Sequence, residues 1–174
     1  TNTSELSRRV ELLGLKRDAM GATNDSYLIT ALLAASSDTS VEQAAREILP
    51  LIKGAFSLVF MDEQTLYAAR DAHGVRPLVL GKVENGWVVA SETAALDIIG
   101  ATFVREIEPG ELLAIDEHGP RTSRFAEATP KGCVFEYVYL ARPDTSIAGR
   151  SVYSTRVELG RTLELAEALS AKWL

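Results

Sequence analysis

The feature of this sequence that most constrains its fold is a change of pattern at Gly54. Before that residue, apolar stretches with helical spacing predict helices over residues 3–15, 26–35 and 41–49, the last one ended by Pro50. After it, short runs rich in β-branched and aromatic residues alternate with turn signals such as Glu-Asn-Gly and Glu-Pro-Gly. Helices followed by a meander of short strands predict an α+β fold rather than repeated β-α-β units.

The strands are expected in the runs AFSLVFM, TLYAAR, RPLVLGKV, GWVVAS, FVREI, ELLAID and RTSRFAE. One helix, over residues 93–100, interrupts them, with Ser91 or Thr93 as its cap and Gly100 as its end. A further helical pattern begins at Ser151 and continues to the end of the chain.

Composition excludes several classes of protein. The formal net charge of −6 argues against a broad surface for nucleic acid or anionic membrane, since both need a basic patch. No stretch approaches the roughly 20 apolar residues of a membrane span, and the N-terminal run TNTSELSRRV lacks the layout of a signal peptide. A single cysteine rules out an internal disulfide framework, so we expect a cytoplasmic protein.

The run CVFEYVYLARPDTSIAGRSVY marks a junction. Residues 133–140 are mostly β-formers interrupted only by Glu136, which predicts an apolar strand. An Arg-Pro-Asp turn and then a long helix follow it. We therefore expect one domain over residues 1–132, a junction over 133–150 and the start of a second domain over 151–174.

As a string, this run resembles the segment that joins the glutaminase domain of amidophosphoribosyltransferases to their phosphoribosyltransferase domain. The segments GAFSLVFMDEQTLYAARDAHGVRPLVLG and VVASETAALDIIGATFVREIEPGEL resemble class II glutamine amidotransferases, and the similarity covers essentially the whole chain. It implies an incomplete αββα sandwich of the N-terminal-nucleophile hydrolase type, followed by the first helix of a phosphoribosyltransferase domain. The implied parent activity is glutamine hydrolysis and transfer of the ammonia to phosphoribosyl pyrophosphate, which gives phosphoribosylamine, the first step of purine synthesis.

The nucleophile of that family is an N-terminal cysteine activated by its own α-amino group. This sequence begins with Thr1 instead, and TNTSEL is similar to a family segment just after the Asn-Gly of the oxyanion hole. We therefore expect the nucleophile and the oxyanion donors upstream of Thr1, with no catalytic residue in this chain. The chain is expected to be a fragment that is inactive by itself, and Thr1 as a nucleophile is disfavoured.

Asp25 is the one glutamine-site residue that the resemblance transfers to this sequence. It lies in ATNDSYLITALL, which matches the family's pattern of a small polar residue, Asp, and Ser or Thr before a helix. From the residues alone, an Asp before an apolar helical run is an N-cap. The resemblance implies that its carboxylate holds the α-ammonium group of substrate glutamine, and we expect both roles at once.

Cys133 has three interpretations. It could be a small buried hydrophobe in a strand, or a reactive thiol, which the neighbouring residues do not favour. The resemblance gives the third, because one subclass of these transferases binds a [4Fe-4S] cluster through four cysteines, one of them at this place. The cluster needs four thiolates and the sequence has one cysteine, so this chain alone cannot assemble it.

His73 lies in the run Asp-Ala-His-Gly, which invites a catalytic interpretation. We favour a structural turn, because the glycine supplies backbone freedom and the family uses this turn structurally.

The resemblance also implies partners: glutamine and phosphoribosyl pyrophosphate as substrates, Mg²⁺ with the latter in the second domain, purine nucleotides as feedback inhibitors, and a homo-oligomeric enzyme. Two alternatives stay open. The chain could belong to another class II glutamine amidotransferase, or it could be a binding module without a nucleophile.

Overall fold

The computed structural model describes residues 2–15, 24–36 and 40–170. The chain divides into two compact units, each made of two separate segments. The first unit comprises Thr1–Val75 and Glu108–Pro130, and the second comprises Arg76–Ile107 and Lys131–Leu174.

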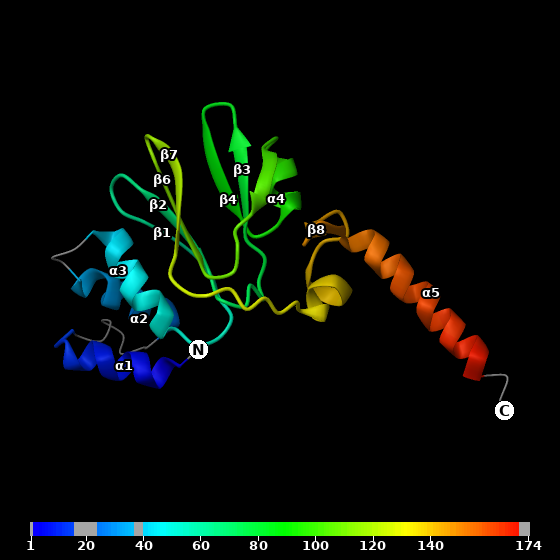
Figure 1. Cartoon of the computed structure of the whole chain (residues 1–174), viewed down its shortest axis with the longest axis horizontal. Coiled ribbons are helices and arrows are strands. Elements are labelled where there is room, and N and C mark those ends of the chain that lie inside the picture. The colour runs from blue at the N-terminus through cyan, green and yellow to red at the C-terminus, as the bar shows by residue number, and fades with distance from the viewer. Residues whose placement is uncertain (1, 16–23, 37–39, 171–174) are drawn as a thin grey trace. The chain divides into compact units, whose positions relative to one another are not determined.

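The first unit combines three helices with a four-stranded antiparallel sheet (Figure 1). Its helices are α1 (Thr3–Leu12), α2 (Asp25–Ala35) and α3 (Val41–Ile48), with the short 3-10 helix η1 (Leu49–Leu51) after α3. Its strands are β1 (Ser57–Met61), β2 (Leu66–Arg70), β6 (Glu111–Asp116) and β7 (Gly119–Arg124), in the order β1-β2-β6-β7. The three predicted helices and these four predicted strands are confirmed.

Apolar side chains of α2 and α3 pack on this sheet and form the core of the first unit. The buried residues of that core are Ile29, Ala45, Leu49, Ile52, Phe56, Tyr67, Ala69, Leu112 and Ala114. A second cluster joins α1 to α2 through Leu6, Val10, Leu28 and Leu32. Burial of these large aliphatic groups, worth about 1.5–3 kcal/mol per side chain, fixes α1 against α2 and so determines where the first turns of the two helices lie.

The second unit holds a three-stranded antiparallel sheet of order β4-β3-β5, a helical turn, a hairpin and a long helix. Its elements are β3 (Val79–Val83), β4 (Gly86–Ala90), α4 (Thr93–Ile98), β5 (Thr102–Glu106), the π-helix η2 (Glu136–Leu140), β8 (Ser146–Ile147), β9 (Arg150–Ser151) and α5 (Val152–Ser170). Leu96 of α4 lies so close to Gly81 of β3 that a Cβ atom there would approach its Cδ2 to 2.7 Å. Gly81 thus lets α4 pack directly on the sheet.

The strand predicted over residues 133–140 is wrong. Cys133 lies in a loop, and the chain then forms the π-helix η2, in which the Ala141 N–H donates to the Glu136 carbonyl at 2.9 Å. β-propensity reflects fit to a half-buried pleated surface, and here Val134, Phe135, Val138 and Tyr139 are exposed while Glu136 is buried. The buried group of this segment is therefore the carboxylate and not the apolar side chains.

The α+β class is confirmed, since helices accompany sheets in which every described strand pair is antiparallel. Within the described residues, no helix is both long and apolar enough to cross a membrane. The domain boundaries after residues 132 and 150 stay predictions.

Candidate functional site

Asp25 is the first residue of α2, and the cap of that helix is its neighbour Asn24. Asn24 has the extended backbone of an N-cap, with φ −104° and ψ 158°, and its side-chain oxygen accepts from the Tyr27 N–H at 2.7 Å. The capping role predicted for Asp25 is therefore wrong. The Asp25 carboxylate instead lies in the first turn, where the positive end of the helix dipole favours an anion.

The Asp25 carboxylate is held by a residue of another helix. Its Oδ1 accepts a hydrogen bond from the Thr3 hydroxyl at 2.6 Å, across 22 positions of sequence. Thr3 is the first residue of α1, and both side chains are half-buried. The fold therefore brings the first turns of α1 and α2 together around one carboxylate.

Asn2 anchors the start of α1 to the segment that follows η1. Its side-chain amide donates to the Leu51 carbonyl at 3.0 Å, and its side-chain oxygen accepts from the Lys53 N–H at 2.9 Å. The amide also donates to Glu5 at 2.9 Å, and this bond, with the Lys53 ammonium next in importance, lowers the pKa of the Glu5 carboxyl. At the start of α1, Asn2 thus binds the main chain at Leu51 and Lys53, and Thr3 binds Asp25.

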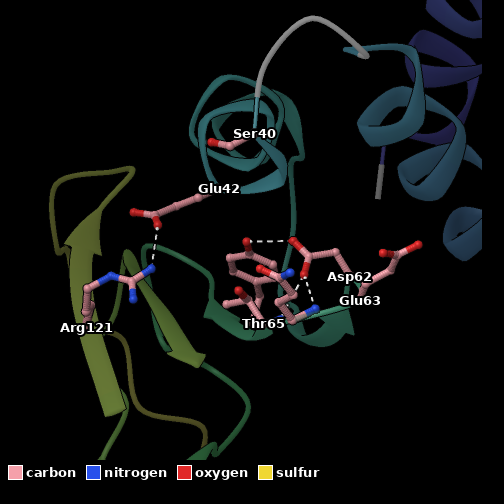
Figure 2. Close-up of a pocket in the computed structure, with 8 residues that line it drawn as sticks. Ser40, Glu42, Asp62, Glu63, Thr65 and Arg121 are labelled. Carbon is pink, nitrogen blue, oxygen red and sulfur yellow. Dashed lines mark hydrogen bonds and ion pairs between the residues drawn. The ribbon is translucent and has the colours of Figure 1, made fainter. Parts of the chain in front are cut away.

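A pocket of about 460 Å³ lies between the start of α3, the turn that joins β1 to β2, and the strands β2 and β7 (Figure 2). It is lined by Ser40, Glu42, Asp62, Glu63, Gln64, Thr65, Tyr67 and Arg121. Asp62 accepts from the N–H groups of Gln64 and Thr65 at 2.9 and 2.8 Å and from the Tyr67 hydroxyl at 3.0 Å. The bond from Gln64 is the largest cause that lowers the pKa of Asp62. The Asp62 carboxylate therefore stabilises the turn between β1 and β2.

Arg121 of β7 lies on another side of the same pocket (Figure 2). Its guanidinium pairs with Glu42 of α3 at 3.4 Å and with Asp116 of β6. The Arg121 hydrogen bond is the main reason that the pKa of Asp116 is lowered. Since the Asp62 carboxylate and the Arg121 guanidinium already bind neighbouring groups of the chain, we assign this pocket no ligand.

The turn around His73 is built on a buried carboxylate. Asp71, only 2% exposed, accepts from the N–H groups of His73 at 2.8 Å, Gly74 at 3.1 Å and Phe56 at 3.1 Å. Gly74 has φ +59°, the left-handed region that favours glycine. The ring nitrogen Nδ1 of His73 lies 3.0 Å from the Thr129 carbonyl oxygen. These contacts agree with the structural interpretation of the turn.

The second unit holds an ion pair with a buried carboxylate and a half-exposed guanidinium, which sequence reasoning missed. Glu136 is 3% exposed and pairs with Arg76. Burial raises the pKa of the Glu136 carboxyl, Arg76 opposes that shift, and Glu92 adds to it. Glu92 in turn accepts from the Thr145 hydroxyl at 3.0 Å. The one signal in the sequence was an acid inside an apolar run, because such an acid is buried only with a partner.

Cys133, also in the second unit, is a half-buried free thiol. Within the described ranges, no three His, Cys, Asp or Glu side chains are grouped so that they could hold a metal ion. The whole sequence supplies one cysteine, which does not fit a cluster that needs four thiolates. The iron–sulfur prediction for Cys133 therefore stays a prediction that depends on residues outside this chain.

Comparison with known proteins gives the family. Residues 1–98 match the family model described as a glutamine amidotransferase domain. The chain belongs to the glutamine amidotransferase domain family. It is 64% identical to the amidophosphoribosyltransferase of Mycobacterium leprae (strain TN) over 93% of this chain and 30% of the relative. Identity to the Bacillus subtilis (strain 168) amidophosphoribosyltransferase is 34%, over 98% of this chain and 35% of the relative.

Solved structures agree with this family. A glutamine phosphoribosylpyrophosphate amidotransferase from B. subtilis, complexed with ADP and GMP, superposes with a TM-score of 0.87 at 35% identity, covering 93% of this chain and 35% of that one. A structure described as the allosteric regulatory enzyme of purine biosynthesis gives a TM-score of 0.89 at 34% identity, over 95% and 35% of the two chains. The predicted resemblance and fold are confirmed. The glutamine amidotransferase chain described here spans about a third of the length of these relatives.

Proposed function

We propose that this chain is part of the glutaminase half of an amidophosphoribosyltransferase. The observation that carries the proposal is 64% identity over 93% of the chain to an enzyme of that name. In the proposed reaction, a nucleophile upstream of Thr1 attacks the side-chain amide of glutamine and releases ammonia. The ammonia then displaces pyrophosphate from phosphoribosyl pyrophosphate, which leaves phosphoribosylamine.

In this proposal, Asp25 binds the α-ammonium group of glutamine. A carboxylate has about four lone-pair sites, so it can accept from Thr3 and from a ligand together. Its place in the first turn of α2 favours the ionised form that a cationic ligand needs. Charge-assisted hydrogen bonds of this kind are about twice as strong as neutral ones. Asp25 thereby supplies both affinity and orientation for the substrate.

The finer assignments belong to the same proposal. Purine nucleotides would act as feedback regulators, an idea supported by the ADP and GMP in the B. subtilis structure. The enzyme would be a cytoplasmic homo-oligomer that uses Mg²⁺ with phosphoribosyl pyrophosphate. Cys133 would supply one of four thiolates to an iron–sulfur cluster, with the other three outside these residues.

The test compares two nitrogen sources in the full-length protein that contains these residues. Asp25→Asn should raise the KM for glutamine about 10- to 150-fold, the equivalent of one hydrogen bond to a charged group. Phosphoribosylamine formation from ammonium salts should stay unchanged, because ammonia bypasses the glutamine site. Asp62→Asn is the matched control, since it changes a carboxylate of the same unit that serves the β1–β2 turn.

Three outcomes would each contradict a part of the proposal. An unchanged glutamine KM in Asp25→Asn would remove Asp25 from the substrate site. A protein that hydrolyses glutamine yet transfers ammonia to an acceptor other than phosphoribosyl pyrophosphate would be another class II amidotransferase. A protein that hydrolyses no glutamine would support the binding-module alternative.

A further inference from the structure

We propose that Thr3 is a positioning residue for glutamine, which acts by orienting the Asp25 carboxylate. The inference rests on the proposed role of Asp25 and extends it to a residue on a different helix. The contact that carries it is the hydrogen bond from the Thr3 hydroxyl to Asp25 Oδ1 at 2.6 Å.

The geometry of this contact is that of a charge-assisted bond. Hydroxyl-to-carboxylate bonds of about 2.5–2.7 Å are shorter and stronger than neutral ones. A bond to Oδ1 restricts rotation of the carboxylate about its last torsion, which is otherwise broad. The second oxygen is then held in one direction before a ligand arrives. Pre-ordering a side chain in this way reduces the entropy lost on binding.

The support behind Thr3 is rigid. The preceding residue, Asn2, is bonded to the main chain at Leu51 and Lys53. One turn further along α1, Leu6 is fully buried against α2. Thr3 is therefore fixed from both sides, as a residue that positions a binding group must be.

Thr3 is not the N-cap of its own helix. The N-cap of α1 is Asn2, and Thr3 already has helical geometry. The Thr3 hydroxyl donates to a carboxylate of another helix. A structural tether between α1 and α2 would explain the same contact, so the test must separate ligand affinity from stability.

The decisive variant is Thr3→Val in the full-length protein, because valine keeps the branched shape and replaces the hydroxyl with a methyl group, which cannot donate a hydrogen bond. We expect the glutamine KM to rise about 2- to 10-fold, with kcat for glutamine and the ammonia-supported rate unchanged. Thr3→Ser should restore the KM. Thr30→Val is the matched control, because the Thr30 hydroxyl donates within α2 to the Ser26 carbonyl at 2.8 Å.

Each remaining outcome identifies which idea fails. If Asp25→Asn raises the KM and Thr3→Val does not, the positioning role is overturned and the role of Asp25 stands. An unchanged KM in Asp25→Asn overturns the substrate role of Asp25 and the positioning role of Thr3 together, whereas the proposed activity fails only if glutamine and phosphoribosyl pyrophosphate give no phosphoribosylamine. A Thr3→Val variant that loses glutamine- and ammonia-supported activity together, or a Thr3→Ser variant that restores nothing, shows that Thr3 is only structural.

Discussion

Removing the arginine that pairs with the buried Glu136 carboxylate of the second unit should destabilise the protein in a way that depends on pH. Arg76→Ala leaves the Glu136 carboxylate, whose side chain is 5% exposed, without the guanidinium that pairs with it. A buried charge without a partner is costly, because the protein interior solvates it poorly. The variant therefore tests whether Glu136 is held as an anion in the folded state.

The structure sets the size of the effect between two limits. Breaking a fully buried pair costs about 3–5 kcal/mol, whereas an exposed pair contributes about 0–1 kcal/mol. The Arg76 side chain is 49% exposed, so water screens part of this interaction. We expect a loss of about 2–3 kcal/mol near neutral pH, which lowers Tm by roughly 4–12 °C for a chain of this size.

The pH dependence follows from the direction of the Glu136 pKa shift. Burial raises the pKa of this carboxyl above its ordinary 4.5, and Glu92 adds to that shift while Arg76 opposes it. Between 4.5 and the raised value, the folded state keeps a proton that the unfolded chain has released. Folded-state stability therefore falls as the pH rises through this window and is level above it. Arg76→Ala removes the interaction that opposes this shift, so the pKa of Glu136 rises further and the pH window becomes wider. The loss of unfolding free energy caused by the substitution should therefore be small below pH 4.5 and reach its maximum near neutral pH.

The assay is urea unfolding of the wild type and the variant at about pH 4 and about pH 7.5, on either side of the carboxyl titration. Trp87 of β4 lies in the same unit and reports its unfolding once Trp173, the other tryptophan, is replaced by Phe. Arg142→Ala is the matched control, because that arginine pairs with Asp144 where both side chains are exposed, so its loss should be much smaller. An equal loss at both pH values, or one no larger than that of the control, would refute the reasoning.

Two further changes test the backbone of the first unit. Gly110→Ala should lower the free energy of unfolding by more than about 3 kcal/mol, because Gly110 has φ +74° and a Cβ atom would lie 2.4 Å from the Ala126 carbonyl oxygen. Gly14→Ala, at φ +69° with no atom within 4 Å of the new Cβ, should cost only about 1–2 kcal/mol; equal losses in thermal unfolding would contradict the steric argument. Asn24→Ala should lower the free energy of unfolding by about 1 kcal/mol. Asn24→Asp should leave it almost unchanged, because aspartate can still accept from the Tyr27 N–H. A loss in Asn24→Asp as large as in Asn24→Ala, measured by urea unfolding, would show that the cap is not at this residue.

Local patterns predicted most of the secondary structure because each element carries its own signals. The apolar spacing and the capping cluster before residue 26 located α2 to within one residue. They could not decide between Asn24 and Asp25 as the cap, because both residue types are good caps and the choice depends on the backbone angles of the turn. The Thr3–Asp25 bond joins positions 22 residues apart. Its partner depends on how α1 packs on α2, which no local pattern contains.

The junction shows why a strong local preference can fail. The sequence around Glu136 favours a strand only if some sheet accepts its apolar side chains. Folding instead buries the Glu136 carboxylate with Arg76, and the Arg156 guanidinium donates to the carbonyls of Tyr137 and Ala141 at 2.6 and 2.8 Å. The Arg156 bonds satisfy two backbone carbonyls of this helical segment, in which Val138 is exposed. At this junction, the acid that interrupts the apolar run indicated a buried carboxylate with a charged partner, whereas the surrounding apolar residues predicted a strand that does not form.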